Sequence, residues 1–339
     1  TNTMSDIDPL NIKKILIIIV SRIGDTLLTT PAIKSVADYY KDAEITILAH
    51  PKRYTILKHL PYVYRVGSIS KKNAPWKGRF GKKYDFALVY GFDEKLVEYA
   101  LRVSGKTIAF SQKDASLNRK LYRSVQISKT QSKTSVDSMM ALPQAIDINI
   151  TTRRLSYYVT KREAQFAEKK ILNKGLGGKF LIGLQVASFP TKAFRDWPIE
   201  YFLELCNKVS EKEVNAHFLI YGSYAEKEKA DWLFEKLGSR VTSFIGMPLR
   251  ETAAIMSKTD LYIGVDTGPT HIMSAFDIPM IALFYCSYTS KSVGTSGHPN
   301  LFTIDHPDIG SCKKNSSMSD ISVKTVTKIV GKILSSNIK

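Results

Sequence analysis

Lys14-Ile-Leu-Ile-Ile-Ile-Val20 runs directly into Ser21-Arg-Ile-Gly-Asp-Thr26, and a helix is predicted over residues 26–40. A short apolar run that passes through a glycine turn into a helix is typical of a strand buried in a parallel sheet. Similar units recur along the chain, with short apolar runs separated by amphipathic stretches. The sequence therefore predicts an α/β fold whose parallel sheet is covered by helices on both faces.

These units form two successive series. The first continues with predicted strands at residues 44–49, 84–89 and 107–110, and the second has predicted strands at 180–184, 216–221, 261–264, 280–284 and 301–304. Between them, a charged helix ends in Asn173-Lys-Gly-Leu-Gly-Gly178, which is typical of a helix stop and a flexible joint. We predict two Rossmann-like domains at residues 1–165 and 166–319. The last segment, 320–339, contains an amphipathic helix that we expect to pack back on the first domain.

The bulk composition limits the class of protein. In 339 residues there are 49 Lys and Arg against 31 Asp and Glu, so the net charge of +18 predicts a polyanionic partner. Three cysteines without a CxxC pair predict neither a disulfide framework nor a zinc site, and they fit a reducing compartment. No apolar run approaches the ~20 residues of a membrane span, and no signal-peptide pattern precedes the first strand. We therefore expect a soluble protein whose membrane contact is peripheral.

Positive charge gathers in the first half of the chain. Residues 51–84 hold ten Lys or Arg, no Asp or Glu, and six aromatic residues, and residues 101–133 hold eight basic residues with Asp114 as the only acid. Such a surface suits an anionic glycolipid at a membrane, where each basic side chain contributes roughly 1 kcal/mol. It would also suit nucleic acid, although no known nucleic-acid-binding module is recognisable. A merely solvated face is the third alternative.

The turn after the first strand carries the first candidate residues. Ligands of open α/β sheets bind beyond the carboxyl ends of the strands, where this turn places Gly24 and Asp25. Gly24 lets a ligand approach the backbone closely. Asp25 is a candidate general base if an acceptor hydroxyl comes within hydrogen-bonding distance. Its other role is the N-cap of a helix beginning at Thr26, and both roles can coexist.

Two loops of the second domain are candidates for holding a phosphate. In Leu261-Tyr-Ile-Gly-Val-Asp-Thr-Gly-Pro-Thr-His271, a strand ends at Asp266 and a helix opens whose free amides predict an anion site that needs no metal. An ordinary capped turn is the alternative, with His271 a satisfied helix residue. In the other loop, Ser188 and Thr191 offer hydroxyls and Lys192 a mobile cation for a departing phosphate, or Lys192 is simply solvated.

Together these stretches resemble glycosyltransferase family 9, the ADP-heptose:lipopolysaccharide heptosyltransferases, over nearly the whole chain. The resemblance rests on Ile23-Gly-Asp25 with Pro31-Ala-Ile33, on Ala187-Ser188, Thr191-Lys192 and Trp197-Pro198, and on Asp266-Thr-Gly-Pro-Thr-His271. It implies the GT-B fold, in which two Rossmann-like domains face each other across a cleft. It also implies an inverting, metal-independent transferase that moves heptose from ADP-heptose to the lipopolysaccharide inner core.

The resemblance also implies roles for single residues. Asp25 becomes the catalytic base and Lys192 the catalytic cation; Phe244-Ile-Gly-Met-Pro-Leu249 lies beside the adenine, and Glu226 or Glu228 contacts the ribose or heptose. The implied donor-binding residues are Gly24, Ser188, Thr191, Met247, Glu228, Asp266, Thr267, Gly268, Pro269, Thr270 and His271. Arg22, Lys52 and Arg53 are candidates for binding the acceptor.

The expected partners follow from the same resemblance. They are a nucleotide sugar and an anionic lipid-linked oligosaccharide at the cytoplasmic face of the inner membrane, with no cofactor, no metal and no nucleic acid. The only DxD pattern, Asp6-Ile-Asp8, falls in a predicted tail away from any strand end. A nicotinamide dehydrogenase is disfavoured because the glycine cluster at 175–178 precedes a strand instead of following one.

Two departures from the family pattern stand out. Thr134-Ser-Val-Asp137 occupies the place where many members have a histidine before a Val-Asp pair, and Ala193 to Asp196 are extra residues that change the local phosphate geometry. The alternatives that remain are a GT-B transferase or an epimerase acting on another nucleotide sugar, and, from another class, a nucleic-acid-binding protein.

Overall fold

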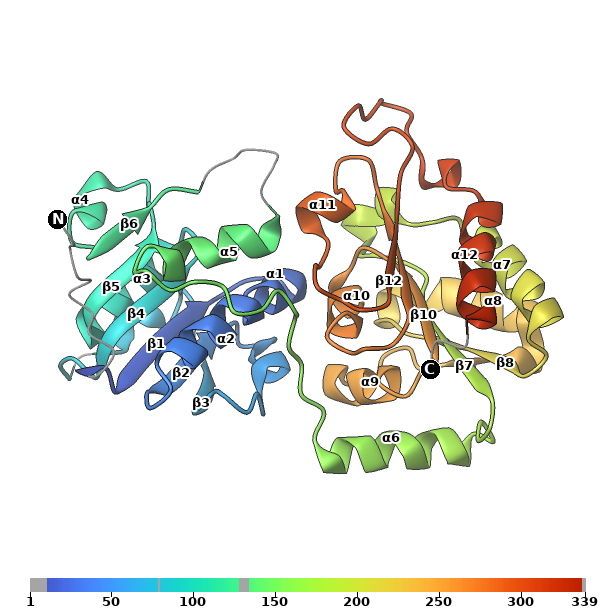
Figure 1. Ribbon diagram of the computed structural model, residues 1–339, viewed down its shortest axis with the longest axis horizontal. Coiled ribbons are helices and arrows are strands. Elements are labelled where there is room, and N and C mark those ends of the chain that lie inside the picture. Colours follow the sequence, from blue (N-terminus) through green and yellow to red (C-terminus); the bar gives the residue numbers. More distant parts are fainter. Residues whose placement is uncertain (1–10, 79, 128–133, 337–339) are drawn as a thin grey trace. The chain divides into compact units, whose positions relative to one another are not determined.

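The computed structural model describes residues 11–78, 80–127 and 134–336 and divides into two compact units, Thr1–Tyr158 and Val159–Lys339 (Figure 1). This division falls seven residues before the predicted boundary at 165. The helix α6 (Lys161–Asn173) therefore belongs wholly to the second unit, where Ala167 and Ile171 pack into a hydrophobic cluster. The joint lies ahead of this helix and not at its glycine-rich end.

The first unit contains one six-stranded parallel sheet in the order β3-β2-β1-β4-β5-β6. Its strands are β1 (Lys14–Ile19), β2 (Glu44–Ala49), β3 (Arg65–Ser68), β4 (Tyr84–Tyr90), β5 (Ser104–Phe110) and β6 (Arg123–Val125). The four predicted strands of this unit are confirmed. The two that were missed, β3 and β6, are short and lie at the sheet edges, where side chains are more exposed and the apolar signal is weak.

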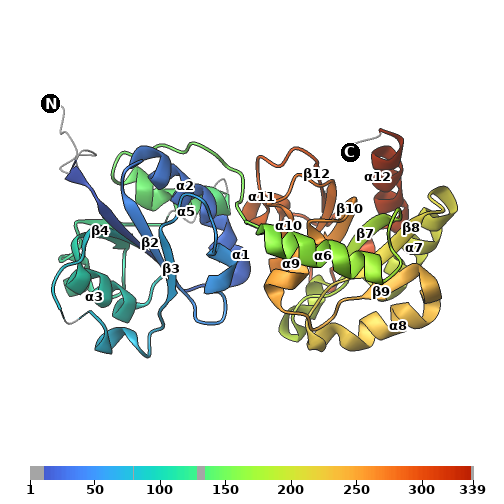
Figure 2. The ribbon, with the colours of Figure 1, turned by 90° about the horizontal axis from the view of Figure 1, so that it is seen from below.

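Helices cover both faces of this first sheet (Figure 2). One face places Leu16, Ala87 and Ala109 against α3 (Glu94–Val103), while the opposite face is covered by helices that contact one another, α2 and α5. The remaining elements of the unit are α1 (Ile23–Leu28), α2 (Thr30–Tyr39), α4 (Ala115–Asn118), α5 (Ser135–Gln144), η2 (Tyr54–Leu57) and η3 (Ala74–Trp76). Two short helices, α1 and α2, thus replace the single helix predicted at 26–40, and Pro31 stands in the first turn of α2.

The second unit repeats this topology, with the sheet order β12-β11-β10-β7-β8-β9. In both units the first strand in sequence is central, the next two extend to one side and the last three to the other, which is the Rossmann order. The strands are β7 (Phe180–Gln185), β8 (Ala216–Ile220), β9 (Val241–Ser243), β10 (Leu261–Val265), β11 (Met280–Phe284) and β12 (Leu301–Asp305). Only the three-residue edge strand β9 was not predicted.

Alternate residues of the second sheet belong to two separate hydrophobic cores, one on each face of the sheet. Ile182 and Ile263 face α7, α8 and α12, whereas Leu181 and Tyr262 face α6 and α9. The helices are α7 (Ile199–Lys212), α8 (Lys227–Leu237), α9 (Leu249–Met256), α10 (Gly268–Met273), α11 (Ser290–Val293) and α12 (Val323–Ser335), with η4 (Pro190–Arg195), η5 (Tyr224–Glu226), η6 (Gly238–Arg240) and η7 (Met318–Asp320).

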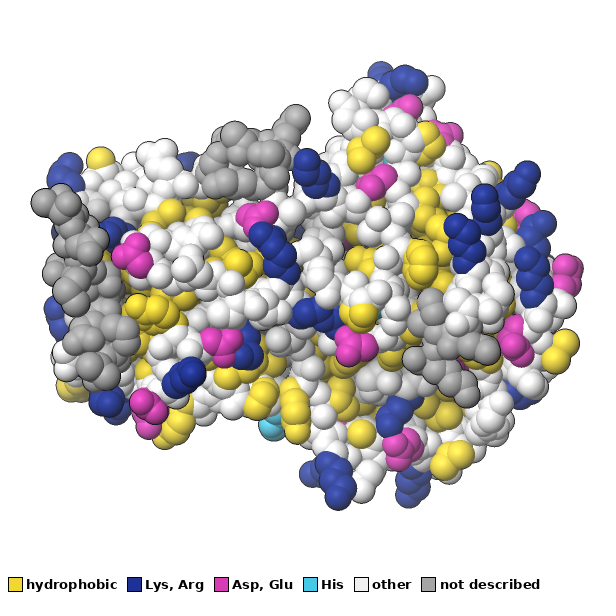
Figure 3. Space-filling view, in the orientation of Figure 1, with side chains coloured by type: hydrophobic (Ala, Val, Ile, Leu, Met, Phe, Trp, Pro, Cys, Tyr) yellow, Lys and Arg dark blue, Asp and Glu magenta, His cyan; other side chains and the backbone are white. Residues whose placement is uncertain are grey.

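The C-terminal helix α12 packs within its own unit, which corrects the prediction that it packs on the first domain. Its apolar side joins the core shared with α7, and Val326 and Val330 are fully or nearly fully buried. Its outer side carries Lys324, Lys328 and Lys332, and Lys and Arg side chains are visible over this helix in Figure 3. Within the ranges that the structure describes, no helix is both long and apolar enough to cross a bilayer.

A disulfide joins Cys286 to Cys312, with 5.4 Å between their Cα atoms. It corrects the prediction of no disulfide, and the cysteines therefore no longer favour a reducing compartment. Cys286 is buried just beyond the carboxyl end of β11, and the segment at 306–317 folds back over it. Two further contacts hold this segment: the Tyr285 hydroxyl donates to the Ser316 carbonyl at 3.1 Å, and the Ser316 hydroxyl donates to Asp308 at 2.7 Å. The pairing arises from this fold-back, which the spacing of the cysteines does not reveal.

Candidate functional site

Each sheet has one point at which the order of its strands reverses, and ligands of open α/β sheets bind in the crevice there. In the first unit this point lies between β1 and β4, and in the second between β7 and β10. Asp25 follows β1, the segment with Ser188 and Lys192 follows β7, and Asp266 follows β10. The three loops chosen from the sequence therefore stand at the two switch points.

Asp25 lies in the first turn of α1 and does not cap the helix. The helix begins at Ile23, with Arg22 in the N-cap position, so the predicted N-cap role at Thr26 is wrong. The exposed carboxylate accepts a hydrogen bond from the Ser21 hydroxyl at 2.9 Å. Ser21, which the sequence reasoning did not select, thus orients one oxygen of Asp25 and leaves the other available to a substrate hydroxyl.

The predicted acceptor residues differ in how the structure places them. Arg53, just before η2, donates from a guanidinium nitrogen to the Ser21 carbonyl at 2.9 Å, which brings a cation to the loop that holds Asp25. Arg22 precedes α1, and Lys52 follows β2; both are exposed. Of these three residues, Arg53 is the one whose contact with the Asp25 loop is observed.

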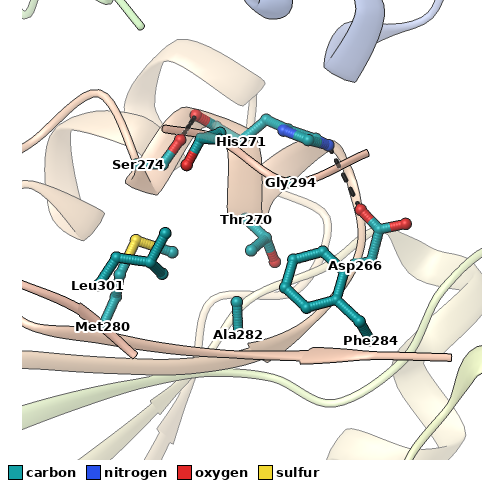
Figure 4. Close-up of a pocket in the computed structure, with 10 residues that line it drawn as sticks. Asp266, Thr270, His271, Ser274, Met280, Ala282, Phe284, Gly294 and Leu301 are labelled. Carbon is teal, nitrogen blue, oxygen red and sulfur yellow. Dashed lines mark hydrogen bonds and ion pairs between the residues drawn. The ribbon is translucent and has the colours of Figure 1, made fainter. Parts of the chain in front are cut away.

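Asp266 is the centre of the second unit's site. Its side chain is 6% exposed; one oxygen accepts a 2.6 Å hydrogen bond from Arg195, and the other lies 3.4 Å from the Nε2 atom of His271. Figure 4 shows the His271 ring directed at this carboxylate. His271 is therefore part of the Asp266 network and is not merely a helix residue.

The turn after Asp266 divides into inward and outward residues. Thr270 points inward: its hydroxyl donates to the Val265 carbonyl at 2.6 Å and lies 3.0 Å from the Tyr262 hydroxyl. The Tyr262 ring lies over Gly264, where an added Cβ would come within 2.7 Å of its hydroxyl oxygen. Thr267, Gly268 and Pro269 are half-buried at the mouth of the turn. Of the six predicted residues from Asp266 to His271, these three are the ones that are partly exposed.

The segment after β7 is organised by two residues that the sequence reasoning treated as an insertion. Asp196 accepts hydrogen bonds from the Ser188 amide at 2.7 Å and from Lys229 at 2.7 Å, and the Ser188 hydroxyl lies 2.6 Å from the same carboxylate. Arg195, the other, reaches Asp266. The signal that could have found them is an Arg-Asp pair immediately before the Trp197-Pro198 helix start.

Lys192 and Thr191 are less constrained than their neighbours. The Lys192 ammonium lies 5.7 Å from the ring centre of Phe194 and 5.6 Å from that of Tyr288. Lys192 has a non-helical backbone inside η4, and Thr191 is exposed. Lys192 is therefore a cation stacked on aromatic rings, with no carboxylate bound to it among the described residues.

The loops after β8 and β9 lie at the same carboxyl edge of the second sheet as the loops after β7 and β10. Glu226 is buried and accepts a 2.7 Å hydrogen bond from the Ser223 hydroxyl, whereas Glu228 is exposed on α8. The Gly246 amide donates to the Gly222 carbonyl at 2.9 Å, which ties the two loops together. Met247 follows, half-buried. The structure thus brings Glu226 to this edge in preference to Glu228.

One other sequence feature has a structural role. Thr134 and Asp137 form a capping box at the start of α5, and Arg153 pairs with Asp137 at 2.7 Å. This departure from the family pattern therefore stabilises a helix end. Asp6 and Asp8, the DxD pattern, lie outside the described residues.

One cluster with metal-ligand chemistry occurs among the described residues, formed by His306, Asp308 and Asp320. Both ring nitrogens of His306 are already engaged: Nε2 lies 2.8 Å from the Ser317 carbonyl, and Nδ1 accepts from the Asp308 amide at 3.0 Å. The histidine therefore fastens the 306–317 segment in the core.

Comparisons with known proteins identify the family of this chain. Residues 82–301, nearly two thirds of the chain, match the model of glycosyltransferase family 9 (heptosyltransferase). The chain belongs to glycosyltransferase family 9. It is 22% identical over 280 residues to the lipopolysaccharide core heptosyltransferase OpsX of Haemophilus influenzae, covering 80% of this chain and 79% of that protein. It is 23% identical to lipopolysaccharide heptosyltransferase 3 of Escherichia coli, covering 77% and 80% of the two chains.

Solved structures of family 9 members share the fold. A family 9 glycosyltransferase from Veillonella parvula superposes with a TM-score of 0.84 at 17% identity, covering 97% of this chain and 99% of the other. The ADP-heptose lipopolysaccharide heptosyltransferase II of E. coli gives a TM-score of 0.78 at 17% identity, covering 96% and 100%. The predicted fold class, GT-B with two Rossmann-like units, is confirmed.

Proposed function

We propose that this family 9 glycosyltransferase transfers heptose from ADP-heptose to the anionic inner core of lipopolysaccharide, with inversion and without a metal. The observation that carries the proposal is the placement of Asp25 beside β1 and of the Arg195–Asp266 pair between β7 and β10, each at a Rossmann switch point. The names of the curated relatives supply the sugar and the acceptor class.

In this reaction the first unit provides the base and the second holds the donor. The Asp25 carboxylate takes the proton of an acceptor hydroxyl as that oxygen forms a bond to the anomeric carbon. The bond from the anomeric carbon to the diphosphate oxygen breaks, and its electron pair leaves with ADP. The Ser21 hydroxyl holds Asp25 in orientation, and the cations beside the β7 segment stabilise the leaving charge.

The charge of each unit supports this division of labour. The first unit has 26 Lys and Arg against 13 Asp and Glu, a net charge of +13, whereas the second has 23 against 18, a net charge of +5. An acceptor that carries several phosphates or carboxylates is attracted to the more positive unit. Arg53, hydrogen-bonded to the Asp25 loop, is suited to contact such a group.

We further propose that the enzyme works at the cytoplasmic face of the inner membrane, where a lipid-linked acceptor is presented. The first unit exposes Trp76 (71%) and Phe80 (88%), with Lys71, Lys72 and Lys77 exposed nearby in sequence. Aromatic rings prefer the headgroup region, and lysines are attracted to anionic lipids. These five residues are the membrane-binding set proposed here.

The decisive experiment measures both substrates. Calorimetry with ADP, UDP and GDP gives the nucleotide preference, and incubation of ADP-heptose with a truncated core glycolipid, followed by mass spectrometry, detects the product. We expect ADP to bind tightest and one heptosyl residue to be added, with the same turnover after treatment with a chelator. Tighter binding of UDP or GDP, or loss of turnover with the chelator, would contradict the proposed donor or the metal independence, respectively.

A further inference from the structure

The disulfide of the second unit is linked by a short series of contacts to the switch point between β7 and β10. We propose that the Cys286–Cys312 bond is a redox switch, whose reduction by a thiol loosens the turn at residues 285–288 and thereby lowers nucleotide affinity. This inference rests on the proposed function for the compartment and for the nucleotide. Disulfides of proteins in a reducing cytoplasm are usually transient and redox-sensing. A disulfide in an enzyme that works there is therefore open to control by thiols.

Cys286 belongs to a tight turn that has a tyrosine at each end. The turn joins β11 to α11, and the Tyr288 amide donates to the Tyr285 carbonyl at 3.0 Å. Cys286 itself is buried, and its bond to Cys312 fixes the turn to the segment at 306–317. Once this bond is broken, Tyr285 supplies the described hydrogen bond and ring contact that still join the turn to that segment.

Both tyrosines of the turn contact η4, the segment after β7. The ring centre of Tyr285 lies 5.2 Å from that of Phe194, and the guanidinium carbon of Arg195 lies 4.8 Å from the ring centre of Tyr288. Arg195 in turn donates to Asp266, the first residue after β10, at 2.6 Å. When the turn is loose, fewer molecules hold this pair in the geometry seen here, and a nucleotide that binds this geometry is held less tightly.

A reductant can approach the disulfide from the Cys312 side. Residues 309–315 are all exposed, and Lys313 and Lys314 directly follow Cys312. Positive charge attracts an anionic thiolate and favours the thiolate form of a neighbouring cysteine. The third cysteine, Cys206, is fully buried against α7's core, where burial raises the pKa of its thiol. Cys206 is therefore unsuited to exchange with the disulfide or to react in its place.

Reduction consumes two molecules of a small thiol for each disulfide. The thiolate of the first attacks the Cys312 sulfur, the S–S bond breaks, and Cys286 leaves with the electron pair and takes up a proton. The thiolate of the second attacks the reductant's sulfur in the mixed disulfide, which releases Cys312 as a thiol. The two reductant molecules end as one disulfide, and their two protons end on the cysteines.

The hydrogen bonds that remain confine the change to one part of the unit. The Nε2 atom of His306 lies 2.8 Å from the Ser317 carbonyl, and the Ser316 hydroxyl donates to Asp308 at 2.7 Å, so both ends of the segment stay fastened. Between them, the described hydrogen bonds of residues 309–315 all lie within the segment. The bond at Cys312 is their covalent tie to the core, so reduction is expected to cause local opening without global unfolding.

Peptide-resolved hydrogen exchange tests the proposed link without any ligand. It compares oxidised protein with protein reduced by dithiothreitol, the redox state being confirmed by alkylation and mass spectrometry. Reduction should speed exchange in residues 306–317 and, through the turn, in residues 189–196, while peptides of the first unit stay unchanged. Cys312→Ser should match the reduced protein and should not respond to dithiothreitol. Cys206→Ala keeps the disulfide and should respond like wild type.

Equilibrium dialysis with ADP measures the effect on binding. Reduction is expected to weaken ADP binding about tenfold, which lies in the usual range for coupling between two parts of a protein. Reoxidation with oxidised glutathione should restore the affinity. Cys312→Ser should bind ADP like reduced wild type under both conditions, and Cys206→Ala should show the full redox effect.

Several outcomes overturn the inference and are distinct from failure of the proposed function. One is unchanged exchange of residues 189–196, or unchanged ADP affinity, after complete reduction. Another is recovery of both Cys286 and Cys312 as thiols after treatment with oxidised glutathione. If wild-type protein prefers UDP or GDP, the proposed donor fails, and the redox effect is measured with that nucleotide. Wild-type protein that binds no nucleoside diphosphate in either redox state overturns both.

Discussion

The two units share one strand order, but the aspartates at their switch points differ in burial and in hydrogen-bond partner. In the first, Asp25 is exposed and takes a hydrogen bond from Ser21, a neighbour four residues away. In the second, Asp266 is buried and bonded to Arg195, which comes from a loop 71 residues earlier in the sequence. The shared topology therefore creates the crevices, and the loops decide the chemistry. An exposed carboxylate suits the proposed base, which must reach a large acceptor, whereas a buried, cross-linked pair suits the proposed nucleotide site.

Removing the proposed base should have the largest effect and should leave nucleotide binding unchanged. We expect Asp25→Asn to lower turnover about 10³-fold, within the range for a lost general base. ADP affinity should stay within about twofold, because the proposed nucleotide site belongs to the second unit. Steady-state kinetics and calorimetry measure the two quantities. Asp42→Asn, an exposed carboxylate of the same unit, is the matched control and should keep full turnover. Comparable loss of ADP affinity in Asp25→Asn would break the proposed division between the units.

Breaking the disulfide should loosen the second unit alone. Because Cys286 and Cys312 are separated by 26 residues, the chain-entropy model gives the bond about 3.5 kcal/mol of stabilisation. Peptide-resolved hydrogen exchange of Cys312→Ser should show faster exchange around β11 and residues 306–317. Peptides of the first unit serve as the internal control. Unchanged protection throughout would mean that the hydrogen bonds of Tyr285 and Asp308 hold this segment unaided.

The pair that fastens α6 to α9 tests where the second unit begins. Arg250 donates to both oxygens of Glu163, at 2.6 and 2.7 Å. Burial alone would raise the pKa of Glu163, but Arg250 and the Thr160 amide and hydroxyl outweigh it and lower the pKa from 4.5 to about 2. Because the folded-state pKa is depressed, this stabilisation is present above pH 4.5 and is lost as the pH falls towards 2.

Glu163→Gln should therefore destabilise the second unit by about 2 kcal/mol at neutral pH, after allowance for its partial exposure. The difference from wild type should shrink between pH 5 and pH 2, as followed by urea unfolding. Glu168→Gln is the control, because the Glu168–Lys258 pair is more exposed and should contribute less than about 1 kcal/mol. Equal effects of the two substitutions would argue against α6 as a built-in part of this unit.

The sequence predicted the central strands well because each is an apolar run of four or more residues between turns. β3, β6 and β9 escaped notice because they are three or four residues long, lie at the sheet edges and are only partly buried. The break between α1 and α2 was also missed, although Pro31, a residue typical of a helix start, lies at this place in the sequence. Such features depend on the neighbouring chain, which a linear pattern does not contain.

The sequence predicted which loops form the candidate site, but not which of their residues contact one another. Asp25, Ser188 and Asp266 stand at the switch points because strand ends are readable from the sequence. The bond between Arg195 and Asp266 is not readable, since it joins residues brought together by the pairing of β7 with β10. For the same reason Arg195 and Asp196 looked like an insertion, and the Cys286–Cys312 pair could not be foreseen.

The smallest expected effect concerns membrane binding, for which we again expect the two units to differ. Lys72→Gln, in the first unit, should weaken binding to vesicles of phosphatidylethanolamine and phosphatidylglycerol about fivefold, because one lysine near an anionic surface contributes roughly 1 kcal/mol. Lys328→Gln removes an exposed lysine from α12 of the second unit and should leave the vesicle affinity unchanged. Both variants lose one charge, so a difference between them in a flotation assay reports the position of the charge and not its number. Equal losses would mean that the membrane senses only the net charge of +18, and the basic, aromatic set around Trp76 would have no special role.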